Sequence, residues 1–183
     1  MGAGILPVTL YRGSIMILLG QERQNNLWCD FGGGSYKCET TYETAIREGS
    51  EELNGLLGTK ERLTITVSQN LITSISNNNF KYTSYVYITP YDSNLPRYFA
   101  NSNDFAQNHL KDKIEDAENG LYEKIKIEWY PLNAFKNDGL TSIVRPHFNQ
   151  IIKSLIKNER FIMDQLKYKS DEKYGEWMNE YGQ

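Results

Sequence analysis

The stretch FGGGSYKCETTYETAIREGSEELNG, residues 31–55, places three glycines ahead of a segment with the pattern of an amphipathic helix. Within that segment Glu48, Glu51 and Glu52 stand at positions i, i+3 and i+4, so a helix brings their carboxylates to one face. Like charges at this spacing on an exposed helix cost about 0.2–0.5 kcal/mol per pair. The pattern therefore indicates that a positive charge, such as a bound cation, belongs among the three side chains.

The residue types in this stretch suit the binding of a diphosphate through Mg²⁺, a hard cation that prefers oxygen ligands and keeps several waters beside substrate phosphates. We expect the backbone of Gly32, Gly33 and Gly34 to turn tightly, present a carbonyl to the metal and approach phosphate oxygens closely. Bound ions would neutralise the diphosphate and lower the pKa of an attacking water. The proton acceptor for that water would be a carboxylate, either on the helix or from another segment.

The helix itself is predicted from about Thr41 to Asn54. Thr40 or Thr41 can cap its start, and Glu43 follows Thr40 at the spacing of a capping box. At its end Asn54 and Gly55 tolerate the left-handed conformation that closes many helices. The side chains expected to face the core are Tyr42, Ala45, Ile46 and Leu53.

Composition places this segment in a single main domain. The chain has 183 residues, 39% of them hydrophobic, and a formal net charge of -3, which provides no global attraction to nucleic acid or to a membrane surface. Cys29 and Cys38 are too few for a secreted disulfide scaffold. No apolar run reaches membrane-spanning length and no secretory signal is present. We therefore expect a soluble intracellular protein, cytoplasmic rather than membrane-associated; its oligomeric state has no signal in the sequence.

Alternating apolar and β-branched residues predict strands at 5–11, 14–20, 63–75, 81–90 and 124–132, with the third and fourth joined as a hairpin. A second helix is predicted over 142–169, with Pro146 in its first turn and His147 as a helix-start residue. These elements indicate an α+β fold. We expect a domain over residues 1–150, with a C-terminal helix and polar tail at 145–183 packed on it or trailing from it.

The glutamate segment closely resembles the Nudix box, a motif written G-x5-E-x7-R-E-U-x-E-E-x-G-U with U a bulky aliphatic residue. The matching residues, in type and spacing, are Gly33, Glu39, Arg47, Glu48, Glu51 and Glu52. The sequence departs from the motif at Gly49 and Gly55, which replace aliphatic residues, and at Asn54, which replaces a glycine. Gly49 is expected to cost the helix about 1 kcal/mol relative to alanine.

The resemblance implies a Nudix-type α/β/α sandwich with a mixed sheet. It also implies that Glu48, Glu51 and Glu52 bind Mg²⁺ or Mn²⁺ with help from the Gly33 carbonyl. Glu39 and Arg47 would pair to brace the loop. The residues 33–55 form the box in this interpretation.

A second stretch, NGLYEKIKIEWYPL at 119–132, is similar to the late strand of messenger-RNA decapping Nudix enzymes, including those of large DNA viruses, and so allows a viral source. In those enzymes a glutamate six residues before a tryptophan is the general base, and Glu123 has this position relative to Trp129. Glu115, Glu118 and Glu128 are alternatives, because in other Nudix branches the base comes from a nearby loop.

These observations predict a Nudix pyrophosphohydrolase that acts on a nucleoside diphosphate-linked substrate, with capped messenger RNA as the favoured class. Glu51 and Glu123 are the candidate catalytic residues. Alternative substrates are diphosphoinositol polyphosphates, dinucleoside polyphosphates, ADP-ribose and oxidised nucleoside triphosphates. A non-catalytic ligand sensor with the same fold is the alternative function, and the intact glutamates argue against it. The candidate substrate-binding residues are Arg12, Trp28, Gly32 and Gly34, although Arg12 also fits a hairpin turn and Trp28 a core position.

Overall fold

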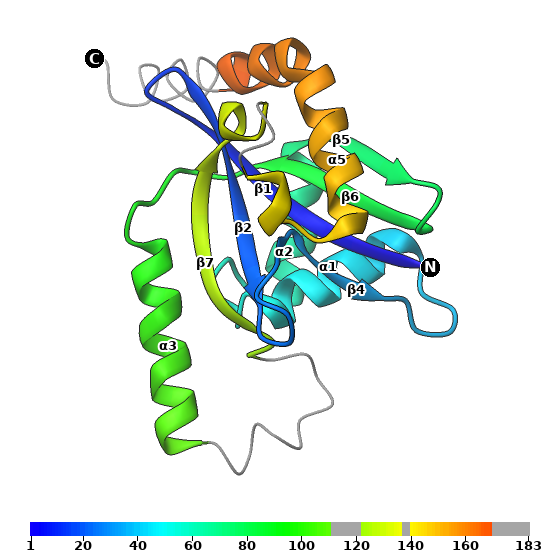
Figure 1. Ribbon diagram of the computed structural model, residues 1–183. Coiled ribbons are helices and arrows are strands. Elements are labelled where there is room, and N and C mark those ends of the chain that lie inside the picture. Colours follow the sequence, from blue (N-terminus) through cyan, green and yellow to red (C-terminus); the bar gives the residue numbers. More distant parts are fainter. Residues whose placement is uncertain (111–121, 137–139, 170–183) are drawn as a thin grey trace, which may run out of the picture.

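A seven-stranded mixed sheet forms the centre of the molecule in the computed structural model, which describes residues 1–110, 122–136 and 140–169 (Figure 1). The strand order is β3-β2-β1-β6-β5, and in addition β4 pairs with β1 and β7 pairs with β2. Among the paired strands of the described residues, β1 and β6 run parallel and the other pairs are antiparallel. The strands are β1 (Gly2–Tyr11), β2 (Ser14–Glu22), β3 (Trp28–Cys29), β4 (Phe31–Gly34), β5 (Leu71–Asn77), β6 (Tyr82–Ile88) and β7 (Lys124–Pro131).

Helices cover both faces of the sheet. The described helices are α1 (Thr41–Glu52), α2 (Lys60–Asn70), α3 (Leu95–His109), α5 (Pro146–Lys157), a helical segment at 159–169 and two short 3-10 turns, η1 (Leu132–Phe135) and η2 (Thr141–Ile143). One apolar cluster joins α1, α2 and α3 to the sheet, and a second joins α5 and the segment 159–169 to the opposite face. This arrangement confirms the expected α/β/α sandwich with a mixed sheet.

The predicted hairpin is present as β5 and β6, but the predicted strand at 63–75 is wrong in its first half, because residues 63–70 belong to α2. The alternation of Leu63, Ile65 and Val67 with polar residues predicts a strand, in which these three side chains would share one face. The helix instead buries Leu63 and Val67, which stand at i and i+4, and leaves Ile65 57% exposed. Thr59 starts the helix, because its side chain accepts a hydrogen bond from the Arg62 N–H.

The C-terminal helix is also shorter than predicted. It begins at Pro146, as expected for a proline in a first turn, but it ends at Lys157, and the chain resumes as a helix at 159–169. Phe148, Ile151 and Leu155 are buried in the core as the helical spacing predicts. The helix α3 was not predicted. None of the described helices is both long and apolar enough to cross a membrane.

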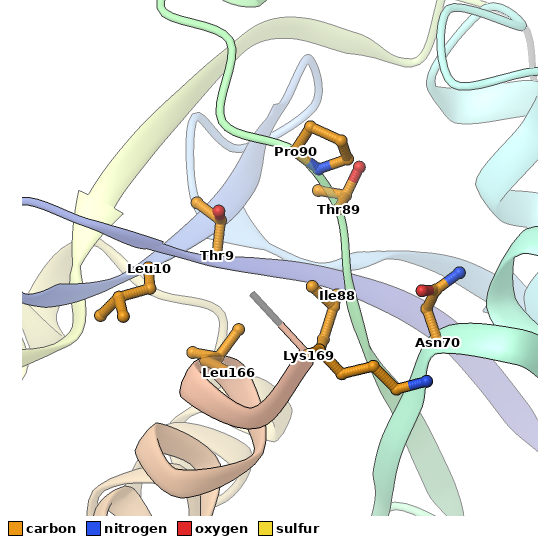
Figure 2. Close-up of a pocket in the computed structure, with 8 residues that line it drawn as sticks. All are labelled: Thr9, Leu10, Asn70, Ile88, Thr89, Pro90, Leu166 and Lys169. Atoms are coloured by element: carbon orange, nitrogen blue, oxygen red, sulfur yellow. The ribbon is translucent and has the colours of Figure 1, made fainter. Parts of the chain in front are cut away.

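A hollow of about 200 Å³ lies where β1 and β6 end, close to the segment 159–169 (Figure 2). Thr9, Leu10, Ile88 and Leu166 contribute to its wall. The residues lining it include no acidic side chain. It also lies at the end of β1 opposite to β4, so it is separate from the glutamates of α1.

Candidate active site

The three glycines form a strand instead of the tight turn expected from the sequence. In β4, Gly32, Gly33 and Gly34 pair antiparallel with Gly4, Ala3 and Gly2 of β1, and none of the three has a positive φ. The absence of side chains serves close packing: a Cβ on Gly32 would collide with the Tyr82 hydroxyl and with Gly4 Cα. The glycines therefore let the two strands and Tyr82 approach each other.

The register decides which glycine carbonyl faces the glutamates. Ser35 N donates to Met1 O (2.9 Å), so the alternation of an antiparallel ladder directs the N–H and C=O of Gly33 toward Ala3. The same alternation turns the polar groups of Gly32 and Gly34 away from β1. Accordingly the Gly32 N–H donates to Glu52 (2.7 Å) and the Gly34 carbonyl accepts from Arg47 (2.8 Å). The expected metal contact of the Gly33 carbonyl thus finds no support in the register, whereas the Gly32 carbonyl lies on the side of Glu52.

Helix α1 has the local features that the sequence predicts. Thr40 and Glu43 form the capping box in both directions, and Asn54 and Gly55 leave the helix with φ of 52° and 71°. The structure explains why a glycine occupies position 49, where the motif has an aliphatic residue. A Cβ there would lie 2.5 Å from Cγ1 of Ile5, so glycine allows α1 to approach β1.

Arg47 is the hub of the glutamate face. Its guanidinium binds both oxygens of Glu39 (2.8 and 3.1 Å), which confirms the expected pair. One nitrogen, Nη1, also donates to Glu48 Oε1 (2.9 Å) and Glu51 Oε2 (3.1 Å), and the centre of the Tyr36 ring lies 4.0 Å from the guanidinium carbon. Hydrogen bonds from Arg47 lower the pKa of Glu39 to about 2. Arg47 therefore holds Glu48 and Glu51 side by side.

Glu52 belongs to a buried network on the other side of the face. Lys124 Nζ lies 3.2 Å from Glu52 Oε1, 2.6 Å from Glu22 Oε1 and 3.1 Å from Cys29 Sγ. Arg145 Nη1 in turn donates to Glu22 (3.0 Å). Burial raises the pKa of Glu52 even though Lys124 opposes that effect, and the neighbouring carboxylates keep the pKa of the buried Lys124 above its ordinary value. This network anchors one carboxylate of the site in the core.

Glu48 and Glu51 remain partly accessible, with side chains 12% and 23% exposed. Burial raises the pKa of both groups, and the negative charges of Glu51 and Glu123 add to the effect on Glu48. Glu123 is exposed and immediately precedes β7. Its carboxylate is therefore close enough to Glu48 to influence it electrostatically.

The donor set fits a hard divalent cation. All candidate ligands are oxygen atoms, and Arg47 contributes one positive charge to a face that carries three carboxylates. Arg47 engages Glu48 and Glu51 through one oxygen each. In the described part of the chain, no three acidic, cysteine or histidine side chains already converge as a metal cage. An ion at this face would therefore replace contacts that Arg47 and Lys124 now provide.

The other residues proposed from the sequence lie apart from this face. Trp28 is 6% exposed and packs edge-on against Tyr130, so its ring is part of the core. Arg12 stands in the turn between β1 and β2 with φ of 48°, at the end of β1 opposite to β4. Glu128 pairs with Lys126 on the exposed side of β7. Glu115 and Glu118 fall outside the described residues.

A pocket next to β4 contains residues that sequence reasoning missed. Phe80, Tyr82, Arg145 and His147 line it together with glycines of β1 and β4, and its volume is about 330 Å³. We call it the glycine-strand pocket. The signal for it in the sequence is the pair of polar residues flanking Pro146, and that signal becomes specific only when α5 is packed against β5, where the Asn77 side chain donates to the His147 carbonyl (2.8 Å).

No protein-family model matches the sequence, and neither does any curated protein. Among solved structures, a bifunctional NMN adenylyltransferase/ADP-ribose pyrophosphatase from Francisella tularensis, in complex with AMP and a manganese ion, aligns with a TM-score of 0.54 and 18% identity. The alignment covers 86% of this chain and 41% of that one. A binary complex of the Caenorhabditis elegans Ap4A hydrolase aligns with a TM-score of 0.50 and 17% identity, over 86% and 96% of the two chains. At these identities the likeness concerns the fold, which is the Nudix fold.

Proposed function

We propose that this protein is a pyrophosphohydrolase that cleaves the pyrophosphate linkage of a nucleoside diphosphate derivative with Mg²⁺ or Mn²⁺. The observation that carries the proposal is the gathering of Glu48, Glu51 and Glu52 at the edge of β4 within a Nudix fold. Two proteins of similar fold support the substrate class, since one is a pyrophosphatase of ADP-ribose and the other a hydrolase of Ap4A.

Glu48, Glu51 and Glu52 would hold the ion, with the carbonyl of Gly32 as a further oxygen ligand in place of Gly33. The bound ion would neutralise the diphosphate and lower the pKa of the attacking water. The chain's own contribution is positional. Arg47 holds Glu48 and Glu51 on one side, and the Gly32 N–H holds Glu52 on the other.

Glu51 and Glu123 are both proposed as acceptors of the proton from the water. Glu51 is the more exposed of the two glutamates that Arg47 holds on α1. Glu123 is supported by its exposure and by its effect on Glu48. Removing a general base typically lowers the rate about 10²–10⁴-fold, so the two roles are separable by mutation.

The finer substrate choice follows from the sequence. The spacing of Glu123 and Trp129 favours the capped 5′ end of messenger RNA, whereas the proteins of similar fold favour small nucleotides such as ADP-ribose and dinucleoside polyphosphates. In both cases the bond that breaks is a phosphoric anhydride. A sensor that binds the same ligands without turnover is the competing function.

The decisive experiment incubates the purified protein and Mg²⁺ with capped RNA, ADP-ribose, a dinucleoside polyphosphate, an oxidised nucleoside triphosphate and a diphosphoinositol polyphosphate. Mass spectrometry should detect release of a monophosphate from one of them. Glu51→Gln should abolish that activity, while Glu61→Gln, an exposed glutamate of α2, should retain it. Full activity of Glu51→Gln would remove the proposed site, and binding without turnover by the unaltered protein would favour the sensor.

Glu123→Gln and Glu128→Gln form a second matched pair, because both residues belong to the same part of the chain but only Glu123 influences Glu48. If Glu123 is the base, its variant should lose activity about 10²–10⁴-fold, and Glu128→Gln should not. Equal activity of the two variants would leave Glu51 as the base.

A further inference from the structure

The glycine-strand pocket adjoins the glutamate site across a single strand. Gly33 faces α1, where a Cβ would lie 2.6 Å from an oxygen of Glu48. Side chains alternate along a strand, so Gly32 and Gly34 face the opposite side, which is the side of the pocket. In addition, Gly32 donates its N–H to Glu52. A diphosphate bound at the glutamates therefore has its attached group beside the pocket.

Aromatic rings form a large part of the pocket wall. The ring of His147 lies 4.7 Å from the ring of Tyr82 and 6.1 Å from that of Phe80, and Phe80 is 56% exposed. Burial, with the charge of Arg145 as a second cause, lowers the pKa of His147 to about 4, so this ring is neutral at pH 7. Exposed and half-buried rings of this kind stack on planar heterocycles. The volume of about 330 Å³ is within the range of small-ligand pockets.

The charges around the pocket determine whether a neutral or a positively charged ring can bind there. Its lining residues include Arg145 and no carboxylate. Three buried acids behind the lining residues are already engaged: Glu22 is bonded to Arg145 and Lys124, Asp30 accepts from Tyr82 (2.9 Å), and Glu52 accepts from the Gly32 N–H and pairs with Lys124. The pocket also lies at the start of α5, the positive end of that helix dipole. A ring with a fixed positive charge would therefore find Arg145 and no carboxylate among the residues that line the pocket.

We propose that the glycine-strand pocket binds the uncharged nucleobase of the substrate and disfavours a base that carries a permanent positive charge. The proposal rests on the proposed function and narrows its substrates: unmodified nucleoside diphosphate derivatives are preferred over the N7-methylated cap of messenger RNA. Phe80 and His147 provide the stacking surface, and Arg145 is the specificity determinant.

Isothermal titration of the full-length protein with GMP and with 7-methyl-GMP, both with Mg²⁺ at pH 6, tests the pocket without requiring turnover. The two ligands differ by one methyl group and by the charge that this group places on the base. GMP should bind about tenfold more tightly than its methylated form. Phe80→Ala should weaken GMP binding about tenfold through loss of stacking, and Phe161→Ala, a similarly exposed ring at 48%, should not.

Arg145→Gln should reduce the difference between the two ligands, because it removes the like charge. The proposal is overturned if 7-methyl-GMP binds as tightly as GMP, if GMP does not bind, or if Phe80→Ala leaves GMP binding unchanged. These outcomes are distinct from failure of the proposed function. If Glu51→Gln loses hydrolysis but Phe80→Ala binds GMP normally, the pocket proposal alone is refuted. If Glu51→Gln hydrolyses normally but Phe80→Ala binds the nucleotide poorly, the proposed catalytic site alone is refuted.

Discussion

Replacing Lys124 by methionine should lower the free energy of unfolding by about 3–5 kcal/mol. The Lys124 side chain is entirely buried, and its ammonium lies 2.6 Å from Glu22 and 3.2 Å from Glu52. Methionine retains most of the apolar stem but not the charge, so two buried carboxylates lose a counter-ion. Removing one partner of a buried ion pair is costly because the remaining charge stays in a low-dielectric interior.

The structure indicates which carboxylate is responsible for the loss. Glu22 keeps a partner in Arg145 at 3.0 Å, whereas within the described parts of the chain Glu52 keeps the N–H of Gly32 and no cation. Glu52→Gln removes the uncompensated charge and retains the acceptor for that N–H. The two substitutions should therefore be non-additive, with a coupling energy of about 2 kcal/mol in a double-mutant cycle.

Burial raises the pKa of Glu52 to about 8, so urea unfolding is measured at pH 9, where this carboxylate is ionised in the wild-type protein; far-ultraviolet circular dichroism follows all four members of the cycle. Lys126→Met is the matched control, because Lys126 lies on the same strand but is 54% exposed and pairs with Glu128 at 3.5 Å. The control should change the free energy of unfolding by about 1 kcal/mol or less. The interpretation of Lys124 and Glu52 as a buried ion pair would be refuted by either of two results: a loss of unfolding free energy below about 1 kcal/mol in Lys124→Met, or strictly additive losses in the Lys124→Met and Glu52→Gln double mutant.

Three further predictions concern other parts of the site. Burial raises the pKa of Asp30 from an ordinary 3.8 to about 6, so the folded protein binds this proton more tightly than the unfolded chain. The free energy of unfolding should therefore fall by up to about 3 kcal/mol as pH rises from about 4 to about 6. Asp30→Asn should remove that fall. If the free energy of unfolding changes equally with pH in the wild type and in Asp30→Asn, the raised pKa of Asp30 is contradicted. Gly49→Ala should lower the melting temperature, because the clash of the new methyl group with Ile5 costs about 1–3 kcal/mol and outweighs the gain of about 1 kcal/mol in helix propensity. Adding Ile5→Val should restore part of the lost melting temperature. An increase in melting temperature in Gly49→Ala would show that α1 can move away from β1. Arg47→Lys should cost about 2 kcal/mol or more in thermal unfolding, since lysine lacks the fork that binds both oxygens of Glu39, and a variant as stable as the wild type would argue against Arg47 as the hub.

Interactions between near neighbours along the chain were predictable from the sequence. The start and end of α1, its capping box and the bidentate pair of Arg47 with Glu39 all depend on residues a few positions apart. The positions of Glu48 and Glu51 on one face follow from the period of the helix. For this segment the one-dimensional spacing already determines the three-dimensional arrangement.

Pairings between distant segments decided the rest. The glycines of β4 are extended because Gly2 and Gly4 of β1 lie against them, and the same pairing moves the outward carbonyl from Gly33 to Gly32. Lys124 reaches a carboxylate 102 positions away in the chain. Local pattern cannot encode such contacts, since the strand register and the packing of α5 against β5 select them. The sequence by itself thus determined the glutamate helix, and tertiary packing decided how its carboxylates are neutralised and which pocket adjoins them.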